Sequence, residues 1–397
     1  MGEPTKQHLI DPEICIRCYT CEMTCSIGAI THNDDNVVVD FEACNFCMDC
    51  IPVCPTGSID EWRVVTKPYS VDEQFGWLEM PEQEAFSTTA SEANTSIEAL
   101  DDEMAKLLAE AHAGAGGKAK PPASASKPSI NLYTIGKPAE ATMQGNYPLT
   151  NDPSHDVRHI ILDMGALPFP VLEGQSIGII PPGTDAKGKP HLPRLYSVSS
   201  PRDGERPNYN NLSLTVKRDE QGVCSNYICD LEKGARVQVT GPFGSTFLMP
   251  SDSKAKILMI CTGTGSAPFR GFTMHRQRTD PGANNPMTLV FGARTPDQLP
   301  YFGPLNKVPE SMLQKHFVFS RADGEEKRYV QDQLREMEDE ISALLEDPNG
   351  YIYICGLRAM EEGVDAAMTN IAEIIGQQWH ALRDTMRDEG RFHVETY

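Results

Sequence analysis

Two patterns of apolar and polar residues follow one another after residue 128. Short apolar runs separated by turn residues predict an antiparallel β-barrel over residues 129–250, for example "HIILDM", "SIGIIPPG", "LSLTVKR" and "RVQVTGP". From residue 251 onward, buried-type strands such as "TLVFGA" and "YIYICG" alternate with helical stretches such as "REMEDEISALLED" and "AMEEGVDAAMTNIAEIIG". This alternation predicts a parallel α/β domain over residues 251–397.

The chain before residue 129 follows neither pattern. Residues 1–62 contain an internal repeat, because "CIRCYTCEMTCSIGAI" recurs 29 residues later as "CNFCMDCIPVCPTGSI". Residues 63–128 are rich in Ser, Ala, Glu, Lys and Pro and are interpreted as a linker. Within it, "TSIEALDDEMAKLLAEAHAG" predicts an amphipathic helix with a capping box at Thr95 and a stop at Gly114. The following "GAGGKAKPPASASKPS" has nothing to bury and is expected to be flexible.

Length and charge narrow the class of protein. A chain of 397 residues exceeds one ordinary core, so a multidomain protein of α+β and α/β parts is expected. The net charge of −21 disfavours binding to nucleic acid and suits a partner with a basic docking face. No apolar run reaches about 18 residues and the first residues lack a signal-peptide core, so a cytoplasmic protein without a membrane partner is expected.

The cysteines indicate metal rather than disulfides. Eight of the twelve fall between residues 15 and 54, and a disulfide framework would require an oxidising compartment. Both copies of the repeat have the spacing C-x2-C-x2-C-x3-C, in which the fourth thiolate of each 4Fe-4S cluster comes from the other copy. Zinc is the alternative, since C-x2-C pairs also form structural zinc sites. The spacing assigns one cluster to Cys15, Cys18, Cys21 and Cys54 and the other to Cys44, Cys47, Cys50 and Cys25.

Residues 10–60 resemble the bacterial-type two-cluster ferredoxins on the strength of these two quartets. Ser26 departs from the family pattern, which usually has proline after the first quartet. Because that proline ligates nothing, the cluster is expected to form with a slightly altered hydrogen-bonding environment and potential.

Four stretches in the later domains have the chemistry of a nucleotide site. "RLYSVSS" sends Arg194 and Tyr196 to one face of a strand, suited to a ligand with a phosphate and a flat ring. "GVCSNYICDLEKG" begins a helix whose backbone N–H groups can receive an anion, and the Gly-rich turn of "ILMICTGTGSAPFRGF" is not the G-x-G-x-x-G of a Rossmann dehydrogenase. "FSRADGEEKRYVQ" offers donors and cations for a 2′-phosphate. The alternatives are a solvated Arg beside a half-buried Tyr and a solvated basic loop.

Taken in order, these motifs resemble the plant-type ferredoxin–NADP reductase family over residues 155–397. The resemblance implies that the barrel binds FAD, with Tyr196 stacked on the isoalloxazine and Ser197 near flavin N5. It also implies that the pyrophosphate of FAD is held by Arg194, Val223, Cys224 and Ser225. The loop "VKRDEQGVC" is shorter than the plant loop that carries an adenine-stacking tyrosine, so the position of the FAD adenine stays open.

The same resemblance implies an NADPH site in the α/β domain. It places Cys355 beside the nicotinamide as a positioning group, Glu395 beside the reacting atoms, and Tyr397 on the flavin face that nicotinamide must occupy. Because Cys355 follows a buried-type strand and has no adjacent base, it is not expected to be a nucleophile. The predicted cofactor-binding residues are Thr262, Gly263, Gly265, Ser320, Arg321, Lys327, Tyr329, Gln331 and Tyr397, and the catalytic ones are Ser197, Cys355, Glu395 and Tyr397.

The complete arrangement, with "QHLIDPEICIRC", "THNDDN" and "GARTPDQLPYFGPL", resembles the reductase components of benzoyl-CoA oxygenases. That resemblance implies an oxidoreductase that passes electrons from NADPH through FAD and two 4Fe-4S clusters to a di-iron oxygenase, which epoxidises benzoyl-CoA in aerobic aromatic degradation. One alternative is a general NADPH–ferredoxin oxidoreductase that serves another acceptor. Another is a non-enzymatic, cluster-bearing redox sensor or interaction protein.

Overall fold

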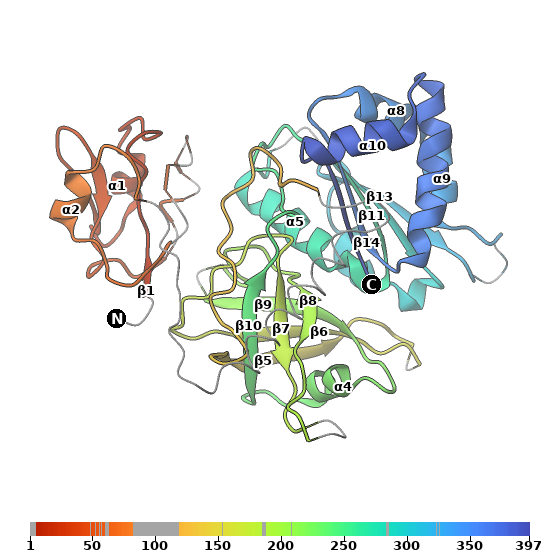
Figure 1. Ribbon diagram of the computed structural model, residues 1–397, viewed down its shortest axis with the longest axis horizontal. Helices are drawn as coiled ribbons and strands as arrows, with labels where there is room; N and C mark the ends of the chain where they lie inside the picture. Colours follow the sequence, from red (N-terminus) through yellow and green to blue (C-terminus); the bar gives the residue numbers. More distant parts are fainter. Residues whose placement is uncertain are drawn as a thin grey trace. The chain divides into compact units, whose positions relative to one another are not determined.

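The protein divides into two compact units (Figure 1). The first comprises Met1–Ala90 with the short segments Met164–Pro170 and Arg206–Asn210, and the second comprises the rest of the chain. The predicted helix from Thr95 to Gly114 lies outside the described residues. The computed structural model describes residues 5–47, 49–51, 53–54, 56, 58–59, 63–81, 119–152, 154–184, 188–207, 209–282, 286–322, 324 and 326–397.

The first unit is built from two small antiparallel pairs of strands. Strand β1 (Thr5–Gln7) pairs with β4 (Arg63–Val65), and β2 (Ile30–His32) pairs with β3 (Val37–Val39). The short helix α1 (Thr20–Thr24) lies within the first cysteine motif. A small core of aliphatic side chains encloses the cysteines, with Cys21 and Cys50 buried; its other buried members are Ile10, Ile30, Val37, Val39 and Ile59.

The predicted linker begins too early, because residues 63–81 fold with the first unit. They supply β4 and helix α2 (Val71–Phe75), which begins with a capping box between Ser70 and Glu73. The buried Gln74 side chain donates to the carbonyl of Val39 at 2.9 Å and accepts from its N–H at 3.2 Å. The composition of residues 63–81 did not indicate this packing, because the polar Gln74 side chain, rather than a cluster of apolar side chains, attaches the segment.

The predicted barrel is confirmed. Its antiparallel sheet has the strand order β8-β7-β10-β5-β6-β9, and a bridge between Val198 and Leu214 brings its two ends together. Helix α4 (Val223–Asp230) follows β9. The strands are β5 (Ala139–Pro148), β6 (Val157–Asp163), β7 (Ser176–Ile180), β8 (Arg194–Ser197), β9 (Asn211–Lys217) and β10 (Arg236–Phe243).

The predicted parallel sheet is also confirmed, with the order β13-β12-β11-β14-β15 and parallel pairing throughout. Its strands are β11 (Lys256–Thr262), β12 (Met287–Ala293), β13 (Leu313–Phe319), β14 (Gly350–Gly356) and β15 (Phe392–Thr396). Its helices are η2 (Gly263–Gly265), α5 (Ser266–Thr279), η3 (Pro296–Gln298), α6 (Phe302–Asn306), α7 (Val330–Glu336), α8 (Glu338–Glu346), α9 (Ala359–Ile374) and α10 (Trp379–Asp388).

Each face of this sheet buries its own apolar core. On one face, alternate strand residues such as Met259 and Tyr353 pack with Phe269 and Phe272 of α5. On the other face, the intervening residues pack against α7, α8, α9 and α10, as Figure 1 shows for the last three helices. Because successive strand side chains point to opposite faces, continuous apolar strands such as "ILMIC" serve both cores.

Residues 119–131, here called the strap, include the described part of the stretch that was predicted to be flexible. Hydrogen bonds hold the strap in place instead. The Lys120 N–H donates to the carbonyl of Arg387 at 3.0 Å, and the Ser124 carbonyl accepts from Ser251. Further along, Ser126 Oγ accepts from an Arg202 guanidinium at 2.8 Å. The strap therefore runs from α10 to the barrel. Its backbone and hydroxyl groups make these contacts beside the buried Pro122, which explains why composition gave little sign of them.

Candidate functional site

The cysteines of the first unit gather as two groups. A cavity is lined by Cys25, Cys44, Cys47 and Cys50, the quartet predicted from the spacing to span both motifs. Burial raises the pKa of the Cys50 thiol to about 12, with the neighbouring Cys44 and Cys47 adding to it. The other group shows the same coupling. Burial raises the pKa of the Cys21 thiol to about 11, and the neighbouring Cys54 and Cys15 add to it.

The second quartet surrounds a space, as a cube with four thiolate ligands requires. In the part of the chain that the structure describes, no group of three or more His, Cys, Asp or Glu side chains converges closely enough to hold a single metal ion. The assignment of each cysteine to a cluster stays a prediction.

The residues predicted to hold FAD come together at the start of α4. Arg194 and Tyr196 on β8 both act on the Cys224 thiol: burial raises its pKa to about 11, while the Tyr196 hydroxyl and the Arg194 charge oppose this rise. Gly222 precedes the helix and offers no side-chain cap, so the N–H groups of Val223 and Cys224 begin the helix without one. A cation, a ring and a helix N-terminus therefore face one region, which fits a dinucleotide with a pyrophosphate.

Barrel and parallel sheet share a buried carboxylate. Glu395 of β15 is 6% exposed, and its Oε1 accepts from Ser197 Oγ at 3.1 Å and from Ser176 Oγ at 3.2 Å. Cys355 lies opposite Glu395 in the β14–β15 register. Burial, with the Glu395 carboxylate adding to it, raises the pKa of Cys355 well above its usual value, which keeps the thiol protonated. Ser197, Cys355 and Glu395, three of the four predicted catalytic residues, thus lie at one point, and their catalytic roles stay predictions.

A pocket of about 540 Å³ opens beside this point, at the carboxyl ends of β11, β12 and β13. Its size suits a cofactor. Tyr397 lines it, is 55% exposed, and its hydroxyl lies 2.5 Å from Thr264 Oγ1. The other predicted cofactor-binding residues that line it are Thr262, Gly263, Ser320, Arg321, Lys327, Tyr329 and Gln331.

Gly265 is the exception among the predicted residues. It is buried below the pocket, where a Cβ atom would lie 2.1 Å from the carbonyl oxygen of Cys355. The structure therefore gives Gly265 a packing role, since it lets the start of α5 approach the end of β14.

Sequence reasoning missed several cations of the pocket. Lys217 lies at the end of β9, and Arg294 follows β12, so only the fold brings them to one site. Burial lowers the pKa of the neighbouring His155, and the charges of Lys217 and Arg294 lower it further. No Asp or Glu occurs among the described residues that line the pocket. The cations that line it are Lys217, Arg294, Arg321, Lys327 and Arg328.

Comparisons with known proteins agree with this site. Residues 259–366 match the oxidoreductase NAD-binding domain, and residues 14–58 match the 4Fe-4S dicluster domain. The chain is 41% identical over 261 residues to the cyanelle ferredoxin–NADP reductase of Cyanophora paradoxa, covering 61% of this chain and 71% of that protein. It is 37% identical over 287 residues to the ferredoxin–NADP reductase of Synechocystis, covering 68% and 70%.

Among solved structures, the ferredoxin–NADP+ reductase of Plasmodium falciparum superposes with a TM-score of 0.54 at 28% identity, covering 68% of this chain and 99% of that one. Fold and site define an NADP-dependent oxidoreductase in which an FAD-type barrel and a parallel α/β domain are joined to a 4Fe-4S ferredoxin domain. The chain belongs to the ferredoxin–NADP reductase family. Membership implies FAD and NADPH as cofactors. No helix in the described ranges is long and apolar enough to span a bilayer.

Proposed function

We propose that this protein delivers electrons from NADPH, through FAD and two 4Fe-4S clusters, to a di-iron oxygenase that epoxidises benzoyl-CoA in aerobic aromatic degradation. The observation that carries the electron-transfer part is the presence of both cysteine quartets in one chain with the basic pocket and the Ser197–Glu395 contact. FAD, when bound, accepts two electrons from NADPH and releases them singly, which matches the one-electron capacity of iron–sulfur clusters.

The residues of the pocket bind and orient NADPH. Ser320, Arg321 and Lys327 hold the 2′-phosphate, since two cations and a hydroxyl suit a doubly charged group. Tyr329 and Gln331 hold the adenine end, and the turn at Thr262 and Gly263 takes the pyrophosphate. The described lining has no acid that would select against a phosphate.

Ser197, Glu395, Cys355 and Tyr397 prepare the reacting end. The Ser197 hydroxyl donates to Glu395, which fixes both groups relative to the barrel and the sheet. The neutral Cys355 thiol fills the space beside the nicotinamide and excludes water. Tyr397 covers the position of the nicotinamide until NADPH displaces its ring.

Arg194, Tyr196, Val223, Cys224 and Ser225 bind FAD in this proposal. The two quartets bind the clusters, with Cys54 and Cys25 as the ligands exchanged between motifs. Because the ferredoxin domain and the reductase belong to one chain, a tether replaces diffusion and raises the local concentration of the ferredoxin.

The identity of the final electron acceptor is the most specific part of the proposal, and it rests on sequence motifs. "QHLIDPEICIRC", "THNDDN" and "GARTPDQLPYFGPL" resemble the reductase components of benzoyl-CoA oxygenases. The second candidate is a general NADPH–ferredoxin oxidoreductase, which the family relatives favour because they are ferredoxin–NADP reductases.

Purified di-iron oxygenase separates the two candidates. The protein is expected to oxidise NADPH in a benzoyl-CoA-dependent way when that oxygenase is present, and to reduce an artificial dye without it. Dye reduction with no stimulation by oxygenase and benzoyl-CoA would leave the general oxidoreductase. Failure to reduce dye with NADPH would refute both.

A further inference from the structure

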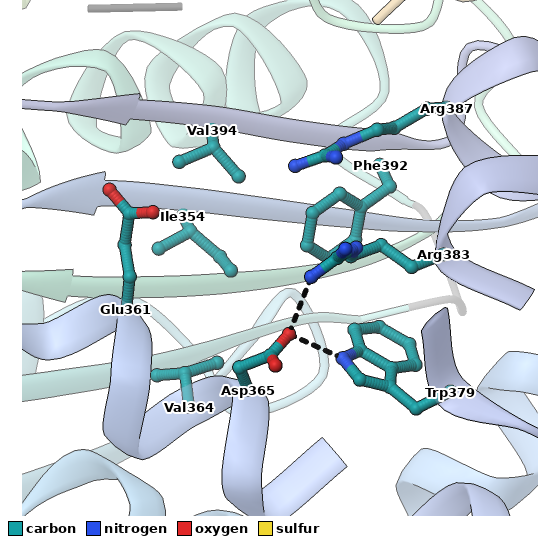
Figure 2. A pocket seen from close by; sticks show the side chains of 9 residues that line it. All are labelled: Ile354, Glu361, Val364, Asp365, Trp379, Arg383, Arg387, Phe392 and Val394. Atoms are coloured by element: carbon teal, nitrogen blue, oxygen red, sulfur yellow. Dashed lines mark hydrogen bonds and ion pairs between the residues drawn. The ribbon is translucent and has the colours of Figure 1, made fainter. Parts of the chain in front are cut away.

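A small cavity behind β15 contains a carboxylate that reaches the segment carrying Glu395 and Tyr397. The cavity lies between the parallel sheet and helices α9 and α10 (Figure 2). Glu361, in the first turn of α9, borders it on one side, and the guanidinium groups of Arg383 and Arg387 border it on the other. Glu361 is 8% exposed. Burying a carboxylate is costly unless it is hydrogen-bonded or paired with a charge, so its partners are informative.

The Glu361 carboxylate contacts the strand through Thr396. Thr396 Oγ1 donates a hydrogen bond to Glu361 Oε1, although the two residues are 35 positions apart. Thr396 itself is 1% exposed. The bond therefore joins the beginning of α9 to the last residue of β15 in the interior, where a side-chain hydrogen bond is not weakened by competing water.

Alternation along β15 links this bond to the reacting site. Successive side chains of a strand point to opposite faces, so Glu395 and Tyr397 point one way while Thr396 points to α9. Glu395 accordingly meets Ser197, and Tyr397 lines the NADP pocket. The same hydrogen bond thus holds the strand from behind at the residue between the two functional groups.

The remaining contacts leave the Tyr397 side chain as the part that can move. Its N–H donates to the carbonyl of Gly356 at 3.1 Å, and its carbonyl accepts from Arg358 at 3.2 Å. The hydroxyl contacts Thr264 at the pocket surface. Backbone contacts and the bond to Glu361 fix the base of the residue, while the ring lines the pocket and makes a hydrogen bond at its far end.

We propose that Glu361 is a positioning residue for the nicotinamide site, which acts through Thr396 to hold Tyr397 in the position that nicotinamide must take. This rests on the proposed role of Tyr397 as the cover of that position. Because the backbone of Tyr397 is held firmly, its ring returns to the pocket when the nucleotide leaves. Loss of the bond weakens the competition between Tyr397 and nicotinamide, so the oxidised cofactor binds more tightly.

Two ligands and one substitution test this in the full-length protein with its FAD and clusters. Thr396→Val removes the hydroxyl at nearly constant volume. Calorimetric titration is expected to show NADP+ binding about five-fold tighter, the equivalent of one hydrogen bond. Binding of 2′-phospho-AMP, which lacks the nicotinamide, is expected to stay unchanged. Thr396→Ser keeps the hydroxyl and serves as the matched control with the parent's affinities.

The carboxylate side is tested in the same way. Glu361→Leu is expected to reproduce the effect of Thr396→Val, whereas Glu361→Gln keeps an oxygen acceptor and stays near the parent. In a Tyr397→Ser background, Thr396→Val should have no further effect on NADP+ binding, because the group through which it acts is gone.

The outcomes separate the two levels of proposal. Equal changes for NADP+ and 2′-phospho-AMP, or an undiminished effect of Thr396→Val in the Tyr397→Ser background, would overturn the positioning role and leave the NADPH site intact. No effect of Tyr397→Ser on NADP+ binding would refute the covering role and the positioning role together. If the parent binds neither ligand, the NADPH function itself is wrong.

Discussion

At the scale of single residues, the proposed preference for NADPH rests on charge. Lys327 lines the pocket, and its ammonium lies 5.0 Å from the centre of the Tyr329 ring, next to the aromatic group proposed for the adenine. NADH lacks the 2′-phosphate but shares the rest of the molecule. The preference for NADPH therefore depends on residues that contact this group alone.

Lys327→Glu is expected to weaken NADPH by at least about ten-fold and NADH much less, because a charge-assisted contact becomes a repulsion. Steady-state KM values for dye reduction with each cofactor measure this. Lys233→Glu, an exposed position outside the pocket lining, controls for the change in net charge. Equal losses for both cofactors would refute the phosphate assignment.

Gly265 provides a test of packing at the same scale. Gly265→Ala places a methyl group against the Cys355 carbonyl, and backbone cannot yield as a flexible side chain does. The substitution is expected to cost about 1 to 3 kcal/mol of unfolding free energy. Thermal unfolding of the variant measures it. Gly282→Ala, where a Cβ meets nothing within 4 Å, should leave the midpoint nearly unchanged.

Residue types with one dominant chemistry were the easiest to predict. Cys25 lines a cavity with the other three cysteines of its predicted quartet, and Arg321 lines the pocket, while their roles as ligands stay predictions. Lys217 lies in "VKRDEQGVC" and Arg294 in "GARTPDQLPYFGPL", but both were missed because only the fold brings the two cations to the pocket. Glu361 was missed for a different reason: nothing in "AMEEGVD" distinguishes a buried first-turn glutamate from the solvated one beside it.

At the scale of elements, a polar network joins the barrel to the parallel domain. Arg270 of α5 donates to both oxygens of Glu205 at 2.6 and 2.7 Å, and His159 of β6 lies 3.3 Å from the same carboxylate. The Tyr301 hydroxyl continues the network to His159 and to Thr215 of β9. Side chains from α5, two barrel strands and the segment before α6 thus fix the angle between the two sheets.

Glu205→Gln is expected to lower the unfolding free energy by about 3 kcal/mol, because Arg270 loses its buried partner charge. Burial alone would raise the pKa of Glu205, but hydrogen bonds from His159 and Arg270 outweigh it and hold the pKa well below its usual range. The folded pKa is thus below the unfolded value of about 4.3, so the contribution is complete above that value and is lost only as pH falls through the folded pKa.

The difference in stability between the parent and Glu205→Gln should therefore not shrink between pH 8 and pH 5.5. Thermal midpoints of both proteins, scanned at one rate in matched buffers, measure the difference. A difference that disappears at pH 5.5 would contradict the assigned direction of the pKa.

In the second unit, strands with clear apolar runs were predicted, whereas β5 and β15 were not. Strand β5 buries Ala139, Ala141 and Gly145, and such small residues give little hydrophobic signal. Strand β15 is buried along its whole length, yet Glu395 and Thr396 make it look polar. Its polar residues are buried because they bond to Ser197 and Glu361, contacts that only the tertiary structure creates.

At the scale of the whole molecule, the protein combines a ferredoxin unit and a reductase unit. The order of these units was predictable from composition and repeats. Their boundaries were not, because residues 63–81 and the strap attach through polar groups. Sequence patterning detects apolar burial, and both segments are attached mainly by hydrogen bonds.

Cys54→Ser tests the division of labour between the units. Loss of this ligand is expected to remove the first cluster, which lowers the iron content by about half if two four-iron clusters are present. NADPH-dependent reduction of ferricyanide at the flavin should persist, while electron delivery to a protein acceptor falls. Cys229→Ser, a buried position on α4, controls for the substitution. Unchanged iron would refute the ligand role.

The strap also determines where a junction can be placed in a chimeric protein that joins this reductase to another electron carrier. A crossover upstream of Ala119 keeps the contacts of Lys120, Ser124 and Ser126 with the reductase unit. A different one-electron carrier could then replace the ferredoxin while the same NADPH-oxidising part is retained. A crossover at residue 129 removes those contacts from α10 and from Arg202. The strap therefore belongs with the reductase, and a junction placed before Ala119 lets the electron carrier be exchanged without loss of these contacts.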